Sequence, residues 1–244
     1  MYETAPGYEE LRERLAEVRR SIEKRARQAG RNPAEIKLVA VSKTHAPETL
    51  RRAIEAGVAD LGENRVQEAD EKINELGRES ACWHLIGHLQ ANKARRAVAL
   101  FDVIHSLDSV SLAERLDRLC EELGREELPV LIQVELGDEA TKSGVSEQEL
   151  PELVKAVGEC SHLRLTGLMT LPPFFDDLEL VRPYFARLRK LRDTLQERGV
   201  FATGQGELSM GMSHDYGVAI EEGATIVRVG TAIFGERRAV NDNH

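Results

Sequence analysis

The chain has 244 residues, of which 41% are hydrophobic and 31% are charged, and its formal net charge at pH 7 is −9. That composition is typical of a soluble globular protein, and the longest apolar runs fall far below the roughly 18 residues that a membrane span requires. The acidic balance argues against nucleic-acid binding, which needs a concentrated basic surface.

The N-terminal segment and the cysteines indicate a reducing compartment. The first residues, MYETAPGYEELRERL, lack the basic segment and apolar block of a signal peptide, and their acidic residues argue against a transit peptide. The three cysteines are widely spaced and outside any CxxC pair, which predicts neither a disulfide framework nor a zinc site: Cys82, Cys120 and Cys160. We therefore expect a cytoplasmic protein with reduced thiols.

The first predicted element is an amphipathic helix over about residues 8–29. Apolar residues recur there at helical spacing with charges between them, and Gly30 stands where a helix would end: Leu11, Leu15, Val18 and Ile22.

Eight short apolar runs follow, and amphipathic stretches separate them. The runs, of which the second and seventh are the weakest, cover 38–41, 58–61, 83–86, 101–104, 130–134, 163–168, 207–210 and 226–229. Helical patterns lie at 112–123, after a capping Ser109, and at 178–195. Strands that alternate with helices indicate parallel pairing, and eight such units predict a (β/α)₈ TIM barrel. We expect one domain over 1–244 with the barrel at about 36–235; a doubly wound open sheet is the alternative, because periodicity cannot show closure.

Polar segments directly follow the apolar runs, where a barrel of this kind carries its functional residues. They are SKTH (42–45), GENR (62–65), GHLQANK (87–93), HSLDS (105–109), ELGDEATKSG (135–144), MTLPP (169–173), GMSHD (211–215) and GTAIFG (230–235).

Lys43, in LVAVSKTH, follows the first run directly. A lysine that points into a barrel mouth would be partly desolvated, which lowers its pKa and leaves more neutral amine to attack a carbonyl. A lysine whose stem covers apolar surface while its ammonium reaches water is the structural alternative. This stretch by itself leaves both open.

The C-terminal segment favours a ligand. Ser213, Gly230 and Thr231 provide hydroxyls and small residues in the loops after the seventh and eighth runs, where TIM barrels often bind phosphate. Arg228 lies inside the run IVRV, so it would be buried and needs partners.

Several of these segments resemble a known family. KLVAVSKTHAPETLRRAIEAGVADLGENRVQEA, WHLIGHLQANK, GLMTLPP and LSMGMSHDYGVAIEEGATIVRVGTAIFG look like the YggS/PROSC family of pyridoxal-phosphate homeostasis proteins. The blocks extend over about residues 36–235. That family in turn resembles the barrel domain of alanine racemase.

The resemblance implies a role for each matching residue. It implies that Lys43 forms a Schiff base with pyridoxal 5′-phosphate and that Arg228 faces the pyridine nitrogen of this cofactor. The remaining matches are the phosphate cradle, two positions that line the cofactor and one basic residue near its phenolic oxygen: Ser213, Gly230 and Thr231; Asn64 and Met169; and Lys142.

These roles favour binding over catalysis. An arginine donates to the pyridine nitrogen and leaves it unprotonated, which makes the ring a poor electron sink. Racemases of this kind add a tyrosine base from a further β domain, and this sequence ends about ten residues after GTAIFG, so we expect no such domain. We expect reversible holding of pyridoxal phosphate for intracellular homeostasis, with transfer to apo-enzymes.

Two other functions are kept as alternatives. One is a pyridoxal-phosphate-dependent amino-acid racemase or lyase, for which Tyr216 would be an internal base. The other is a metal-dependent barrel hydrolase, which the absence of HxH or HExxH spacing disfavours. His84, between Trp83 and Leu85, is expected to be a hydrogen-bonded histidine of the barrel.

Overall fold

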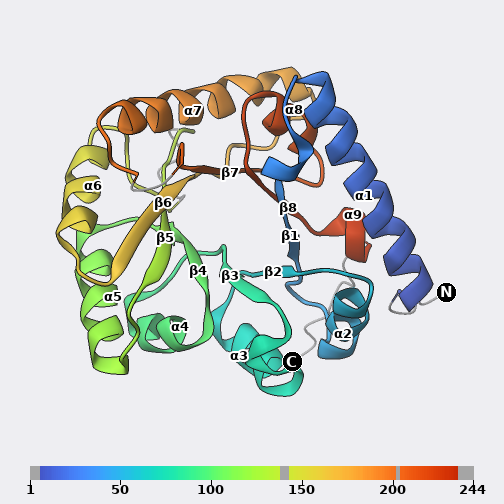
Figure 1. Ribbon diagram of the computed structural model, residues 1–244, viewed down its shortest axis with the longest axis horizontal. Coiled ribbons are helices and arrows are strands. Elements are labelled where there is room, and N and C mark those ends of the chain that lie inside the picture. The colour runs from blue at the N-terminus through green and yellow to red at the C-terminus, as the bar shows by residue number, and fades with distance from the viewer. Residues whose placement is uncertain (1–5, 138–142, 202–203, 236–244) are drawn as a thin grey trace, which may run out of the picture.

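The computed structural model describes residues 6–137, 143–201 and 204–235. Eight parallel strands close into a barrel, in which each strand pairs with the next and β8 pairs with β1 (Figure 1). The strands are β1 (Lys37–Val41), β2 (Asp60–Glu63), β3 (Cys82–Leu85), β4 (Val103–Leu107), β5 (Leu128–Gln133), β6 (Leu163–Met169), β7 (Glu207–Met212) and β8 (Ile226–Val229).

Helices surround the barrel (Figure 1). The α-helices are α1 (Tyr8–Gln28), α2 (Pro47–Glu55), α3 (Val66–Leu76), α4 (Ala94–Leu100), α5 (Val110–Leu123), α6 (Leu150–Glu159), α7 (Arg182–Glu197), α8 (Tyr216–Glu221) and α9 (Thr231–Phe234). Short 3₁₀ turns are η1 (Pro33–Glu35), η2 (Arg78–Ser80), η3 (Ala91–Lys93) and η4 (Leu178–Leu180).

The predicted N-terminal helix is confirmed as α1. Its four predicted apolar positions are all buried, and the helix packs against α8 and α9. Arg25 on α1 pairs with Glu221 on α8 at 3.0 Å. Helix α1 therefore covers the side of the barrel where the last strand, β8, pairs with the first, β1.

All eight predicted strands are present, two of them displaced by two residues toward the C-terminus. The run 58–61 becomes β2 at Asp60–Glu63, because the Val58 amide donates to Ala53 O and so closes the end of α2. The run 101–104 becomes β4 at Val103–Leu107, because the Phe101 amide closes α4 on Ala97 O. Val58 and Phe101 are buried as loop residues, and an apolar run cannot distinguish such residues from a strand.

The structure confirms the predicted start of α5 and corrects the predicted start of α7. Ser109 Oγ accepts from the Leu112 amide at 3.3 Å, as a capping serine should. Helix α5 ends just before Gly124, whose φ of +67° suits glycine. The pattern that began at Leu178 starts instead with η4, and α7 begins at Arg182 with Pro183 in its first turn.

Closure of the barrel rules out the alternative of a doubly wound open sheet. Strand β8 pairs with β1 in parallel, with Val39 opposite Arg228. Inside the barrel, one small cluster packs together: Val39, Leu131, Met169 and Ile226. The larger core lies between the strands and the helices.

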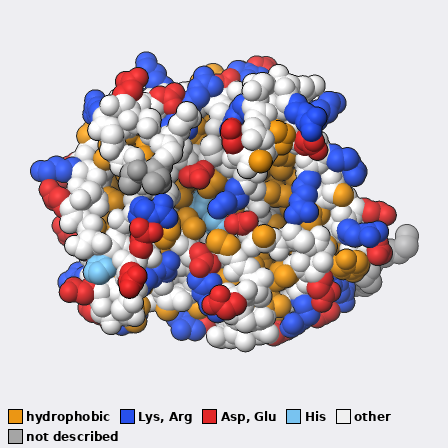
Figure 2. Space-filling view, viewed as in Figure 1, with side chains coloured by type: hydrophobic (Ala, Val, Ile, Leu, Met, Phe, Trp, Pro, Cys, Tyr) orange, Lys and Arg blue, Asp and Glu red, His pale blue; other side chains and the backbone are white. Residues whose placement is uncertain are grey.

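The surface is mixed in charge. Figure 2 shows acidic and basic side chains interspersed over the face in view, with hydrophobic side chains between them. Within the described parts of the chain, no helix has both the length and the apolar content that crossing a membrane requires.

Candidate functional site

The predicted site residues gather at one end of the barrel. Because all strands run in parallel, their C-terminal ends meet at a single face. The described candidates lie at or just after such ends, on β1, β2, β6, β7 and β8: Lys43, Asn64, Met169, Ser213, Arg228, Gly230 and Thr231. Lys142, the eighth candidate, lies outside the described residues.

Two loops bring the predicted phosphate-binding residues together. Ser213 follows β7, and its Oγ accepts from the amides of Gly230 at 3.1 Å and Ala232 at 3.5 Å, which follow β8. Thr231 lies between them in the chain and is exposed. Hydrogen bonds to one serine hydroxyl therefore hold the loops after β7 and β8 together, and the predicted phosphate-binding residues lie in these two loops.

Arg228 is almost fully buried and has neutral partners. It donates from Nη1 to Ser209 Oγ at 2.6 Å and from Nη2 to Thr170 O at 2.9 Å. Burial lowers its pKa to about 10, although the charge of Asp215 acts in the opposite direction. The guanidinium is thus still a cation at neutral pH and can only donate.

Lys43 lies in a turn whose neighbouring residues are held on both sides. The Ser42 hydroxyl donates to Glu63 Oε1 at 2.6 Å, and Lys72 Nζ donates to Ser42 O at 2.7 Å. On the other side, the Thr44 amide donates to Glu68 Oε1. Thr44 has a φ of +69°, an unusual conformation for threonine that these contacts maintain.

A buried ion cluster makes these contacts, and we refer to Glu63, Glu68 and Lys72 as the clamp. Lys72 Nζ donates to Glu63 Oε1 at 2.7 Å and to Glu68 Oε1 at 2.6 Å. Burial raises the pKa of Glu63, and the charge of Lys72 opposes that rise. Within the described part of the chain, Glu63 Oε2 has no hydrogen-bond partner.

The sequence interpretation missed the clamp. It treated GENR as the source of Asn64 alone, although Glu63 ends an apolar run and is fully buried. The available signal was the pair Glu68 and Lys72, which stand four residues apart on a predicted helix and so share one face. Nothing in that spacing shows that Glu63 would join them.

The Lys43 loop also contacts the last helix. The ring of His45 stacks on Phe234 of α9 with a centroid separation of 4.8 Å. Close to it, a Cβ on Gly230 would lie 3.2 Å from Val41 O. The turn with Lys43 and the segment with Gly230 and Thr231 are therefore neighbours.

Asn64 and Met169 occupy different environments. Met169 is fully buried and packs inside the barrel against Val39 and Leu131. Asn64 is half-buried, and its backbone lies so close to the next loop that a Cβ on Gly87 would be 2.3 Å from Asn64 O. Only glycine fits at position 87.

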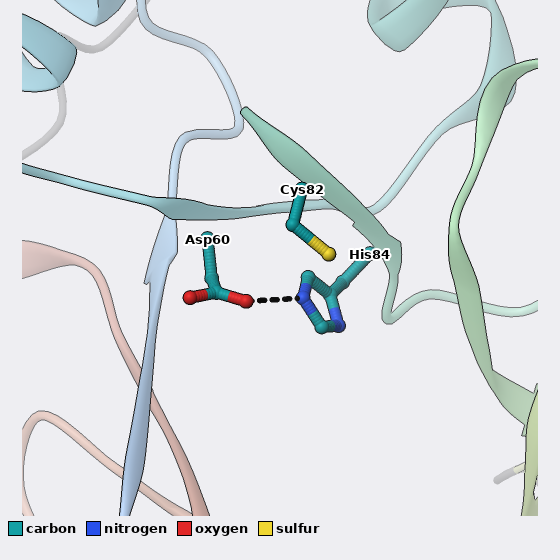
Figure 3. A group of neighbouring side chains, drawn as sticks. All are labelled: Asp60, Cys82 and His84. Atoms are coloured by element: carbon teal, nitrogen blue, oxygen red, sulfur yellow. Dashed lines mark hydrogen bonds and ion pairs between the residues drawn. The ribbon is translucent and has the colours of Figure 1, made fainter. Parts of the chain in front are cut away.

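His84 is hydrogen-bonded on both ring nitrogens, as predicted. Its Nε2 lies 3.0 Å from Asp60 Oδ1, and its Nδ1 lies 2.9 Å from His105 Nε2. Figure 3 shows that Asp60 on β2 and Cys82 and His84 on β3 point toward one another.

These three side chains have ligand atoms within 4.8 Å of one another, a spacing that a metal ion could use. Two features favour the hydrogen-bonded state instead. Burial, with the charges of Asp102 and Asp60, raises the pKa of the Cys82 thiol to about 12, and Lys37 Nζ is 3.9 Å from Asp60 Oδ1. A metal would have to displace a firmly held proton beside an ammonium group.

A cavity of about 680 Å³ opens at the opposite end of the barrel, where the strands begin. The first residues of several strands line it, together with His84: Lys37, Val103, Glu207 and Ile226. The predicted site residues thus lie at one end of the barrel and the cavity at the other.

Tyr216 is the predicted internal base of the racemase alternative. Tyr216 begins α8, three residues after Ser213, and a Cβ on Gly211 would lie 2.9 Å from its Cα. A catalytic role for Tyr216 stays a prediction.

Comparison with known proteins identifies close relatives. The sequence model of the alanine racemase N-terminal domain matches residues 14–238. A pyridoxal phosphate homeostasis protein of Aquifex aeolicus is 44% identical over 226 residues, which cover 93% of this chain and 98% of that protein. A protein of the same name from Escherichia coli is 44% identical over 227 residues, which cover 91% of this chain and 95% of that one.

Solved structures agree with these matches. PipY of Synechococcus elongatus with pyridoxal phosphate bound superposes with a TM-score of 0.77 at 39% identity, over 92% of this chain and all of that one. Alanine racemase of Corynebacterium glutamicum superposes with a TM-score of 0.69 at 17% identity, over 96% of this chain and 62% of that enzyme. The second likeness concerns the fold alone.

Proposed function

The chain belongs to the alanine racemase N-terminal domain family and, within it, to the pyridoxal phosphate homeostasis proteins, and from this membership we propose that it binds pyridoxal 5′-phosphate for intracellular homeostasis of that cofactor. The PipY relative holds pyridoxal phosphate in its solved structure and is alike over nearly the whole chain. The finer proposal is that Lys43 holds the cofactor covalently and reversibly.

The residues at the C-terminal end of the barrel fit the three polar parts of this cofactor. Its phosphate needs hydrogen-bond donors, and the hydroxyl groups of Ser213 and Thr231 lie in the two loops, after β7 and β8, that hydrogen bonds to Ser213 Oγ hold together. Its ring nitrogen needs one donor, which the buried Arg228 can supply. Its aldehyde condenses reversibly with a primary amine when the cofactor is bound, and Lys43 carries the amine on the same face.

The clamp and Arg228 would have different roles in binding the cofactor. The clamp holds the backbone on both sides of Lys43, so the amine starts from a defined position. Arg228 donates a hydrogen bond and keeps its own proton, so that it would leave the ring nitrogen unprotonated. This favours holding the cofactor over chemistry that draws electrons into the ring.

The observation that supports the proposal most is the convergence of all seven described candidates on one end of a closed barrel. They come from positions as far apart as 43 and 231, and closure places β1 beside β8. We also propose that the protein acts in the cytoplasm and passes the cofactor to apo-enzymes. Transfer is testable with a purified apo-enzyme as acceptor.

Reductive trapping tests the covalent role of Lys43. The protein is mixed with pyridoxal phosphate, reduced with borohydride and digested, and the peptides are weighed by mass spectrometry. We expect the cofactor mass on the peptide that carries Lys43 and its loss in Lys43→Ala. Lys37→Ala, at the opposite end of the barrel, is the matched control and should keep the label.

Two results would contradict the assignment. If Lys43→Ala incorporates as much label as the wild type, another lysine, such as Lys142, is the acceptor. If the wild type takes up no label and its absorbance does not change with excess cofactor, the proposed binding itself is wrong.

A further inference from the structure

A line of buried polar side chains crosses the interior of the barrel from β2 to β8. His84 Nε2 lies 3.0 Å from Asp60 Oδ1, and His84 Nδ1 lies 2.9 Å from His105 Nε2. His105 Nδ1 lies 2.9 Å from Ser209 Oγ, to which Arg228 donates at 2.6 Å. Both histidines and the serine are fully buried. We call this continuous series of hydrogen bonds from Asp60 to Arg228 the interior chain.

The two ends of the interior chain determine which way its hydrogen bonds run. An arginine only donates, and an ionised carboxylate only accepts. Ser209 accepts from Arg228, so its single hydroxyl proton can pass to Nδ1 of His105. His105 then donates from Nε2 to His84 Nδ1, and His84 donates from Nε2 to Asp60. In this direction both imidazoles are neutral and carry their proton on Nε2.

The opposite direction needs an extra proton. It would place protons on Nδ1 of both rings, and the added proton would lie on Asp60 or on Nε2 of His84. Burial raises the pKa of Asp60, but the hydrogen bond with His84 and the charge of Lys37 outweigh burial and lower it. Burial, together with the charge of Arg228, lowers the pKa of His105. The direction from Arg228 to Asp60 is the one that needs no added proton.

We propose that Asp60 is a positioning residue for Arg228, which it orients from the opposite end of the barrel through the interior chain. Ser209 Oγ and Thr170 O accept from the two terminal nitrogens of the guanidinium and so determine its plane. The proposal rests on the proposed function in one respect, the direction of that guanidinium toward the ring nitrogen of the cofactor.

The coupling acts through a proton position. The Ser209 hydroxyl has one proton, and while His105 Nδ1 accepts it, the lone pairs of the oxygen are turned toward Arg228. That acceptor nitrogen exists only while His105 carries its proton on Nε2, which His84 accepts. His84 in turn is held in the same tautomer by the Asp60 carboxylate. A change at Asp60 can therefore reach Arg228, which it does not contact.

The first test measures tautomers in the protein without cofactor. ¹⁵N NMR distinguishes protonated from unprotonated imidazole nitrogens, and we expect Nε2–H at both His84 and His105 at pH 7. Asp60→Leu removes the acceptor, and both rings should become mixtures. Lys155→Met removes an exposed charge on α6 and leaves the interior chain and its surroundings intact, so it is the control.

Several outcomes would overturn the interior chain. One is an Nδ1–H tautomer or an imidazolium at His84 or His105 in the wild type. Another is a set of tautomers in Asp60→Leu that equals that of the wild type. If Asp60→Leu does not fold, Ser209→Ala removes the donor to His105 Nδ1 and leaves Asp60 in place, so both rings should keep Nε2–H, and an Nδ1–H tautomer at His84 in that variant would overturn the interior chain.

The second test measures binding of pyridoxal phosphate. Loss of one hydrogen bond in the interior chain should raise the dissociation constant about fivefold in Asp60→Leu, with Lys155→Met unchanged. Equal affinities in both variants would overturn the positioning role. If the wild type binds no cofactor, the proposed function and the purpose of the interior chain both fail, whereas the wrong tautomers with binding intact overturn the interior chain alone.

Discussion

At the scale of single residues, the surroundings of Lys43 depend on the buried cation of the clamp. Lys72 Nζ contacts both clamp carboxylates and Ser42 O, and its side chain is 4% exposed. Because Glu63 is fully buried, its charge is stable in the fold only beside that ammonium group. One lysine thus supports the backbone on which another lysine is presented.

Lys72→Met should therefore lower the free energy of unfolding by about 3 kcal/mol, since it leaves a buried carboxyl without its cation. The pKa of Glu63, already raised by burial, should rise further. A carboxyl whose pKa is raised in the fold favours the folded state while it is protonated. This contribution to the free energy of unfolding is complete below the unfolded pKa of about 4.5 and is lost as pH rises through the folded pKa. The deficit relative to wild type should grow with pH, and urea unfolding at several pH values measures it.

Lys155→Met is the control for that experiment. Lys155 forms an exposed pair with Glu159 at 3.8 Å, and such pairs contribute at most a few tenths of a kcal/mol, roughly. Equal losses in the two variants would show that the clamp has no special role.

At the scale of elements, the site depends on how closely the loops after neighbouring strands approach. The loop after β3 passes the loop after β2 so closely that no side chain fits at Gly87. By contrast, Gly158 lies near the end of α6, where a Cβ would have no other atom within 4 Å. A side chain is therefore excluded at position 87 and has room at position 158.

Gly87→Ala should lower the free energy of unfolding by about 2 kcal/mol, because the added Cβ meets the backbone of Asn64 and something must shift. It should also weaken cofactor binding, since Asn64 is a predicted lining residue. Gly158→Ala should raise the free energy of unfolding by about 0.5 kcal/mol, because alanine favours the helix. Chemical unfolding of both variants measures these values, and a loss in Gly158→Ala or none in Gly87→Ala would contradict this account.

At the scale of the whole molecule, the closed barrel encloses polar groups whose protonation affects global stability. His105 is fully buried, and burial together with the charge of Arg228 lowers its pKa well below 6.5. The unfolded chain binds a proton at this histidine below about pH 6.5, and the folded chain does not. The folded state is therefore stabilised above that pH and loses this contribution in acid.

The free energy of unfolding should fall by about 1.4 kcal/mol per pH unit below pH 6.5 on account of this one group, until its folded pKa is reached. His105→Gln should show a smaller slope by that amount. His88→Gln, in which the replaced side chain is half exposed, should keep the slope of the wild type. If the slopes of all three proteins are equal, His105 takes up a proton in the folded state.

The sequence by itself determined the alternation of strands and helices, the N-terminal helix and the face on which the site lies. Apolar periodicity records which side of an element is buried, and polar residues after apolar runs mark the C-terminal ends of strands. Lys43, Ser213 and Arg228 could be chosen in this way because each belongs to a local pattern. The resemblance to a family then assigned their roles.

Only the tertiary structure decided that the barrel closes, that Val58 and Phe101 lie outside the strands, and which polar groups meet inside. Ser209 and His105 are 104 positions apart, and Ser42 and Lys72 are 30 apart. No periodicity relates such residues, because their distance depends on the register and closure of all eight strands together. The interior chain and the clamp are for that reason properties of the folded barrel, and the pattern of any single element does not contain them.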